Sequence, residues 1–178
     1  MKSPTPNTNL YLIGPMGSGK SSVGAQLSKL TGLKFIDSDS EIEKRVGVTI
    51  AWIFEVEKEE GFRKREAGII AELTQEKGII LSTGGGAVLN PSTRSILHNS
   101  GTVIYLQVSP SEQFVRTSFR KDVRPLAQNL TQKELIELNS KREPLYQEIA
   151  HLQYLTDNHQ PRELAKKILE HLNEIKNK

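Results

Sequence analysis

Short apolar runs alternate along the chain with longer stretches in which apolar residues recur at helical spacing. The short runs predict strands, and they cover residues 10–13, 34–36, 79–82, 102–108 and 152–155. The longer stretches predict helices at 20–31, 40–46, 49–54, 59–75, 91–98 and 110–119, from 131 to at least 146, and at 161–175. Strands separated by helices imply parallel pairing, so we expect an α/β protein with helices on both faces of one sheet.

Two of the predicted helices have clear start signals. Asn90 can cap a helix whose first position is Pro91, where a missing backbone N–H costs nothing. Thr131 and Glu134 have the spacing of a capping box, in which each side chain bonds the other residue's backbone N–H. Both helices are therefore expected to begin at these residues.

The first apolar run leads directly into the glycine-rich segment Gly14-Pro15-Met16-Gly17-Ser18-Gly19-Lys20-Ser21. This segment matches the phosphate-loop pattern G-x-x-x-x-G-K-[ST], in which consecutive backbone amides surround an anion. The helix that follows adds its positive dipole end. Lys20 is expected to reach the β- and γ-phosphates, and Ser21 to ligate Mg²⁺. A chance glycine turn is the alternative, but a strand before and an amphipathic helix after the segment favour a nucleotide site.

Composition narrows the classes of protein that fit. With 178 residues, of which 36% are hydrophobic, one domain spanning residues 1–178 is expected. The net charge of +3 comes from 24 basic and 21 acidic residues spread along the chain, which gives no support to a nucleic-acid partner. The lack of cysteine excludes disulfides and thiol chemistry, and it fits a reducing compartment such as the cytoplasm.

Residues 1–8 have a single basic residue and no apolar stretch, so a flexible tail is expected there rather than a signal peptide. Apolar runs stay well short of the roughly 18 residues that a membrane span needs, and no membrane partner is expected.

Two aspartates, Asp37 and Asp39, stand at the end of the second predicted strand. In extended backbone they would point to opposite sides, so one could face a metal ion and the other a substrate. Phosphoryl transfer needs such a group to orient the attacking hydroxyl and accept its proton. The alternative is that Asp39 only caps the next helix.

The third predicted strand ends in Gly84, Gly85 and Gly86, which would allow close backbone approach, positive φ and free amides for an oxyanion. Arg63 is three residues from Glu66, which could fix its guanidinium. Taken singly, Arg63 and Arg142 fit solvated surface charges. If they converge beside the glycines, they form a clamp for a carboxylate.

Arg124 lies in a basic, aperiodic segment at about 120–130, which suggests a mobile lid that closes over the phosphates. An ordinary solvated loop cation is the alternative. The four histidines show no metal-ligand spacing, and Trp52 is expected to serve packing.

Taken together and in order, six segments resemble the shikimate kinase family over about residues 9–175. They are the phosphate loop, Phe35-Ile36-Asp37-Ser38-Asp39, Gly61-Phe62-Arg63-Lys64-Arg65-Glu66, Thr83-Gly84-Gly85-Gly86, Arg124-Pro125-Leu126 and Lys141-Arg142-Glu143-Pro144-Leu145-Tyr146. A phosphate loop alone fits many nucleoside and sugar kinases, whereas the whole set is far more specific. Two positions depart from the family: Lys58 stands where a glycine is usual, and Ala127 replaces the second leucine of R-P-L-L.

The resemblance implies a three-layer P-loop kinase of the nucleoside monophosphate kinase type, with five parallel strands and a mobile lid. It implies transfer of the γ-phosphate of ATP to the 3-hydroxyl of shikimate, giving shikimate 3-phosphate and ADP on the route to chorismate and the aromatic amino acids. ATP would be the co-substrate, one Mg²⁺ ion would bind each subunit, and the enzyme would be a cytoplasmic monomer.

The resemblance also implies roles for individual residues. Lys20 and Arg124 would stabilise the transferring phosphoryl group, and Asp39 would hold the substrate hydroxyls and act as the base. Ser21 would bind Mg²⁺, with Asp37 acting through water. The shikimate site would consist of Asp39, Arg63, Arg142 and the amides of Gly84, Gly85 and Gly86, with its helices at about 38–75. The ATP site would consist of Gly17, Ser18, Gly19, Lys20, Ser21, Ser22, Arg116, Arg124 and His159, where His159 takes a position at which some members have an arginine.

Two other functions stay open at this stage. One is a related small-molecule kinase, for example for gluconate, although paired arginines beside a glycine loop suit a carboxylated ring better. The other is a nucleotide-binding regulator that has lost catalysis, which the presence of Lys20, Asp39 and Arg124 argues against.

Overall fold

The structure is a computed structural model that describes residues 9–118 and 130–176. The predicted tail at 1–8 lies outside the described residues. So do Arg124, Ala127 and most of the predicted lid.

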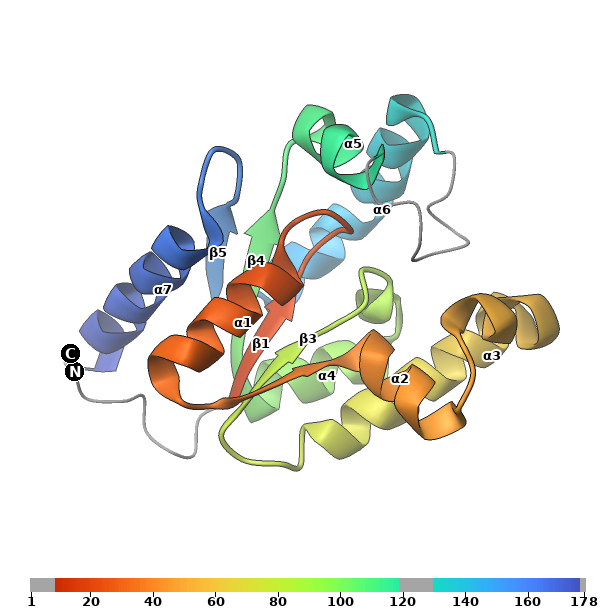
Figure 1. Ribbon diagram of the computed structural model, residues 1–178, viewed down its shortest axis with the longest axis horizontal. Helices are drawn as coiled ribbons and strands as arrows, with labels where there is room; N and C mark the ends of the chain where they lie inside the picture. Colours follow the sequence, from red (N-terminus) through yellow and green to blue (C-terminus); the bar gives the residue numbers. More distant parts are fainter. Residues whose placement is uncertain (1–8, 119–129, 177–178) are drawn as a thin grey trace.

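Within the described residues, five strands form one parallel sheet in the order β2-β3-β1-β4-β5. The strands are β1 (Asn9–Ile13), β2 (Lys34–Asp37), β3 (Ile79–Ser82), β4 (Gly101–Gln107) and β5 (Leu152–Leu155). β1 and β3 are buried along their whole length, as strands covered on both faces should be. The predicted five-stranded parallel sheet is confirmed (Figure 1).

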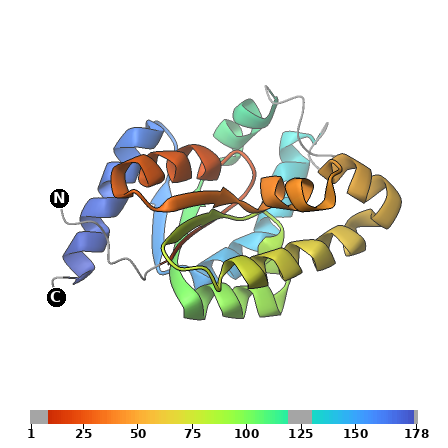
Figure 2. The ribbon, with the colours of Figure 1, turned by 60° about the horizontal axis from the view of Figure 1, so that its bottom comes forward.

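Helices cover both faces of the sheet (Figure 2). They are α1 (Lys20–Thr31), α2 (Ser38–Val46), α3 (Ile50–Leu73), α4 (Pro91–Ser100), α5 (Pro110–Ser118), α6 (Gln132–Ile149) and α7 (Pro161–Lys176), with a short 3₁₀ turn, η1 (Ala87–Leu89), before α4. Alternate residues of β1 serve two cores: Leu12 packs toward α1 and α7, and Ile13 toward α3, α4 and α6. Among the described helices, none combines the length and apolarity needed to cross a membrane.

The register of the sheet brings three strand ends to one edge. Ser82 of β3 lies opposite Leu12 of β1 and Asp37 of β2. The segments that follow these strands are the phosphate loop, the aspartate pair and the glycine triplet, so all three emerge side by side. Ligands of open parallel sheets bind at this edge.

One correction concerns the start of α2, which the sequence placed at Ser40. The helix begins at Ser38, because the Asp37 carboxylate accepts hydrogen bonds from the amides of Asp39 (3.1 Å) and Ser40 (3.4 Å). Asp39 therefore lies in the first helical turn, not on extended backbone, and the residue that caps the helix is Asp37.

Two helices were predicted within 49–75, and α3 does consist of two helical parts that meet at a kink. Thr49 caps it as expected, and the helical geometry breaks only at Lys58. Trp52 was expected to pack, yet 46% of its surface is exposed, because the buried side of this first part of α3 is formed by Ile50 and Ile53.

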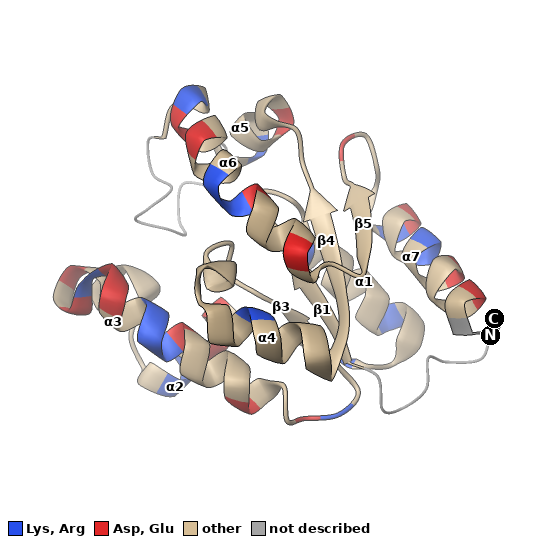
Figure 3. Ribbon diagram, turned by 180° about the vertical axis from the view of Figure 1, so that it is seen from behind, with Lys and Arg blue, Asp and Glu red and all other residues tan. Residues whose placement is uncertain are grey.

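Charged residues of both signs are interspersed along α3, α6 and α7 (Figure 3). Several pair along a helix or with a neighbouring one, as Arg45 does with Glu41 and Glu72. Exposed pairs of this kind contribute little to stability.

Candidate active site

The phosphate loop links β1 to α1 in the way that the sequence predicts. Gly19 has a positive φ of 86° and provides no side-chain cap, and the first turn of α1 contains no acidic residue. The positive end of the helix is therefore available to an anion. The Lys20 ammonium lies back over the loop and donates hydrogen bonds to the carbonyls of Gly14 (2.7 Å) and Pro15 (2.8 Å).

Two cavities open beside this loop. The larger, about 560 Å³, is lined by residues of the phosphate loop and by Arg116, Thr156 and His159, and we call it the phosphate-loop cavity. The smaller, about 390 Å³, is lined by Arg63, Arg142 and the glycine triplet, and we call it the arginine cavity. Met16, Asp39 and Ile50 line both, so the two cavities adjoin.

Every described residue that the sequence assigned to a site lines the cavity expected for it. Those assigned to ATP or its metal ion line the phosphate-loop cavity: Gly17, Ser18, Gly19, Lys20, Ser21, Ser22, Asp37, Arg116 and His159. Those assigned to the substrate line the arginine cavity: Asp39, Arg63, Gly84, Gly85, Gly86 and Arg142. The arginines thus converge beside the glycines, and neither is a simple surface charge.

Ser21 and Asp37 lie together in the phosphate-loop cavity. The Ser21 hydroxyl donates a 2.9 Å hydrogen bond to Oδ2 of Asp37. A hydroxyl and a carboxylate are oxygen donors of the type that Mg²⁺ prefers, so this pair fits a magnesium site next to the phosphates. In the described part of the chain, groups of three or more histidine, aspartate or glutamate side chains that could hold a metal ion do not occur.

Asp39 is 8% exposed and lies at the boundary between the cavities. Its helix is tied to the glycine triplet, because the Gly84 amide donates a 3.1 Å hydrogen bond to the buried Ser38 hydroxyl. This contact, which sequence reasoning missed, fixes Asp39 relative to the arginine cavity.

Arg63 is held on two sides. Its Nη1 donates to Glu66 (2.7 Å), as the sequence predicts, while Nε and Nη2 both donate to one oxygen of Glu59 (3.2 and 3.1 Å). Burial lowers the pKa of Arg63, but its ion pairs with Glu66 and Glu59 outweigh burial and raise the pKa overall. Arg63 therefore stays positively charged, and the edge of its guanidinium formed by Nε and Nη2 faces Glu59.

Gly84 and Gly86 are needed for space and not for unusual backbone angles. The positive φ expected at these residues is absent, since the described glycines with positive φ lie elsewhere in the chain. A β-carbon on Gly84 would come within 2.3 Å of Glu66, and one on Gly86 within 2.2 Å of the Arg63 guanidinium. Both glycines thus let charged side chains approach the backbone closely.

Arg142 and Tyr146 project from α6, and both are buried, at 7% and 1% exposure. The Tyr146 hydroxyl donates a 2.5 Å hydrogen bond to the carbonyl of Gly85. The sequence shows Tyr146 only as part of the Lys141–Tyr146 motif and does not indicate its role, because its partner is 61 residues away.

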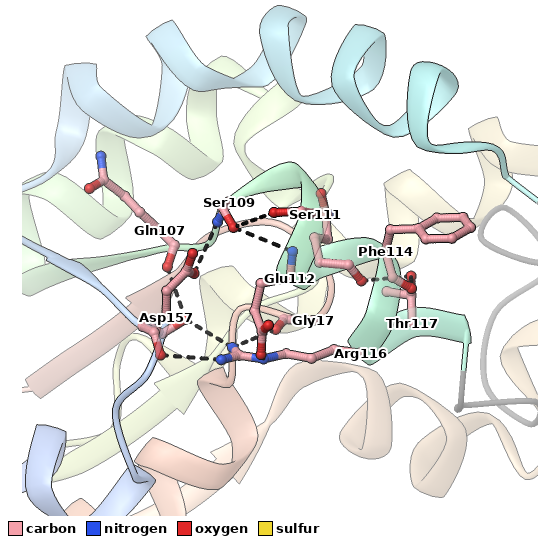
Figure 4. A network of polar contacts seen from close by, with 11 residues as sticks. Gly17, Gln107, Ser109, Ser111, Glu112, Phe114, Arg116, Thr117 and Asp157 are labelled. Carbon is pink, nitrogen blue, oxygen red and sulfur yellow. Dashed lines mark hydrogen bonds and ion pairs between the residues drawn. The ribbon is translucent and has the colours of Figure 1, made fainter.

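Arg116 holds the far side of the phosphate-loop cavity together (Figure 4). It donates to the carbonyl of Gly17 (3.2 Å), to the hydroxyl and carbonyl of Thr156 (3.0 and 3.2 Å), and to Glu112 (2.8 Å). The loop after β5, which also contains His159, is thereby attached to the phosphate loop. Gln113 on the same helix donates to the Met16 carbonyl (3.0 Å), a contact that the sequence did not reveal.

A phosphate loop that adjoins a cavity with two converging arginines defines a P-loop kinase whose acceptor carries negative charge. Comparison with known proteins identifies the family. A family model described as shikimate kinase matches residues 16–173. The chain belongs to the shikimate kinase family, and its activity is ATP-dependent phosphorylation of shikimate.

Individual relatives agree over almost the whole chain. A shikimate kinase of Histophilus somni is 48% identical over 170 residues, covering 94% of this chain and 97% of the relative. A shikimate kinase of Mannheimia succiniciproducens is 51% identical over 164 residues, covering 91% and 93%. Among solved structures, the shikimate kinase of Acinetobacter baumannii in complex with shikimate has a TM-score of 0.93 at 44% identity, covering 97% of this chain and 96% of that one.

Proposed function

We propose that the γ-phosphoryl group of ATP passes to the 3-hydroxyl of shikimate across the boundary between the two cavities. ATP occupies the phosphate-loop cavity, and shikimate occupies the arginine cavity. The observation that carries this proposal is the position of Asp39, which lines both cavities. Arg63 and Arg142 line only the arginine cavity. The similar Acinetobacter baumannii enzyme binding shikimate supports it.

At this boundary Asp39 orients the attacking hydroxyl and accepts its proton. Lys20 leaves the loop carbonyls to reach the β- and γ-phosphates when ATP binds. Arg124 lies outside the described residues. We assign it, together with Lys20, to stabilise the negative charge of the phosphoryl group during transfer. Arg116 and His159 flank the nucleotide on its other side.

The carboxylate of shikimate lies between Arg63 and Arg142. Because the Gly84 amide already donates to Ser38, the amides that remain for the carboxylate are those of Gly85 and Gly86, which have no acceptor within the described residues. This narrows the assignment that the sequence suggested for the whole triplet.

The metal site is assigned to Ser21, with Asp37 acting through a bound water molecule. Mg²⁺ held there would neutralise charge on the phosphate oxygens. The Ser21 oxygen could ligate through a lone pair while its hydrogen still donates to Asp37, and Asp37 would keep α2 capped through its other oxygen. We also assign the enzyme to the cytoplasm and expect it to act as a monomer, which size-exclusion chromatography with light scattering would check.

The direct test is release of ADP from ATP and Mg²⁺ by the purified protein, with and without shikimate. Gluconate and nucleoside monophosphates serve as control acceptors, and phosphorus NMR of the product identifies the phosphorylated hydroxyl. ADP release that occurs with shikimate and not with the control acceptors, with the phosphate on the 3-hydroxyl of the product, supports the proposal. Turnover with gluconate instead would favour the related kinase, and tight ATP binding without turnover would favour a regulator.

A further inference from the structure

Tyr146 connects elements that belong to both sides of the arginine cavity. Its hydroxyl donates to the Gly85 carbonyl, and its ring stacks on that of Tyr105 with centroids 4.9 Å apart. The side chain is 1% exposed, so neither contact is exchanged for water. A buried hydrogen bond of this kind fixes both of its partners.

Arg142 stands four residues before Tyr146 and so lies on the same face of α6. Burial raises the pKa of the Tyr146 phenol well above its ordinary value, and its interaction with the Arg142 guanidinium opposes this only in part. The phenol therefore stays protonated and can donate to Gly85 while its oxygen faces the cation.

Gly85 in turn packs against the phosphate loop. A β-carbon on Gly85 would lie 3.4 Å from both the Gly14 carbonyl oxygen and the Met16 amide nitrogen. The glycine triplet is thus confined between the phosphate loop on one side and the phenol of Tyr146 on the other.

We propose that Tyr146 is a positioning residue for the carboxylate site, which holds the Gly85 carbonyl so that the amides of Gly85 and Gly86 face the substrate in register with Arg142. The inference rests on the proposed function, because it takes these groups to bind the carboxylate of shikimate. Tyr146 itself does not touch the reacting atoms.

The test compares Tyr146→Phe with Tyr105→Phe. Both variants lose one phenolic hydroxyl from the same ring stack, but the Tyr105 hydroxyl bonds Glu143 and not the glycine triplet. Each is assayed well below its own melting temperature. Tyr146→Phe should raise the KM for shikimate roughly five- to tenfold, the effect of losing a buried hydrogen bond, with kcat and the KM for ATP within about twofold. Tyr105→Phe should leave the KM for shikimate unchanged.

An equal KM for shikimate in the two variants would overturn the proposal, even if Tyr146→Phe lowers the melting temperature. The methyl ester of shikimate separates this failure from failure of the proposed function. If the wild-type enzyme uses the ester as well as shikimate, the carboxylate site itself is wrong. If it rejects the ester and Tyr146→Phe behaves like Tyr105→Phe, the carboxylate site stands and only the role of Tyr146 is wrong.

Discussion

The hydroxyl of Ser21 donates to the Asp37 carboxylate at 2.9 Å, and so joins the start of α1 to the start of α2. The other oxygen of the same carboxylate accepts the amides of Asp39 and Ser40. One side chain therefore caps a helix and faces the phosphate-loop cavity. Its charge and its capping role can be separated by substitution.

Asp37→Asn should raise the Mg²⁺ concentration that gives half-maximal velocity roughly ten- to hundredfold, as loss of a group that supports a metal ligand does. Asparagine keeps the side-chain oxygen that caps α2, so the melting temperature should hardly change. Titration of activity with Mg²⁺ measures the effect. Glu41→Gln, on the same helix, where Glu41 pairs with Arg45, is the matched control. An unaltered Mg²⁺ requirement in Asp37→Asn would remove Asp37 from the metal site.

Asp39→Asn should lower kcat by roughly 10²- to 10⁴-fold, because an amide cannot accept the proton of the attacking hydroxyl. The KM for ATP should change little, since the nucleotide is held by the phosphate loop. Added Mg²⁺ should not rescue this variant, in contrast to Asp37→Asn. Equal losses in kcat and in ATP affinity would contradict the assignment of Asp39 as the base.

Features that depend on local sequence could be predicted, and those that depend on distant partners could not. The phosphate loop, the Asn90 cap and the Thr131 capping box follow from spacings of a few residues, and each is found. Asp39 was placed on extended backbone because it directly follows a predicted strand, and only the hydrogen bonds show that Asp37 caps α2 and that Asp39 lies in its first turn.

Contacts across the site carry no local pattern. The bond of Ser38 to Gly84 spans 46 residues, and that of Tyr146 to Gly85 spans 61. Their existence follows from the strand order and register, which bring these segments to one edge of the sheet. Family resemblance, and not pattern, is what assigned Arg63 and Arg142 to a common site.

Glu59 occupies the edge of Arg63 that suits a carboxylate best. One of its oxygens accepts from both Nε and Nη2 of Arg63, and 49% of the Glu59 side chain is exposed. Shikimate must displace this carboxylate in order to pair with the same edge. Glu59→Gln should therefore lower the KM for shikimate roughly two- to fivefold, the range expected for an exposed ion pair.

Glu60→Gln is the control for Glu59→Gln, because it removes the same charge from the next residue. Steady-state kinetics at constant ionic strength compare the two variants. A higher KM for shikimate in Glu59→Gln would mean that Glu59 orients Arg63 and does not compete for it.

Lys58 interrupts α3 with φ 60° and ψ −174°, a backbone region that is almost confined to glycine. The strain of a side chain there costs about 1–3 kcal/mol, and glycine gives back about 0.5–1 kcal/mol in chain entropy. Lys58→Gly should therefore stabilise the protein by about 1 kcal/mol, which raises the melting temperature by roughly 2–4 °C in a chain of this size.

Lys58→Ala separates backbone strain from the side chain of Lys58, whose Nζ donates a 2.7 Å hydrogen bond to the carbonyl of Glu55. Both substitutions remove that exposed contact, but only glycine relieves the strain. Calorimetry should show a gain for Lys58→Gly and none for Lys58→Ala. Equal melting temperatures in the two variants would show that the positive φ is not what limits stability here, and that the interruption of α3 is held by its flanking contacts, such as the pair of Glu57 with Arg65 across the break.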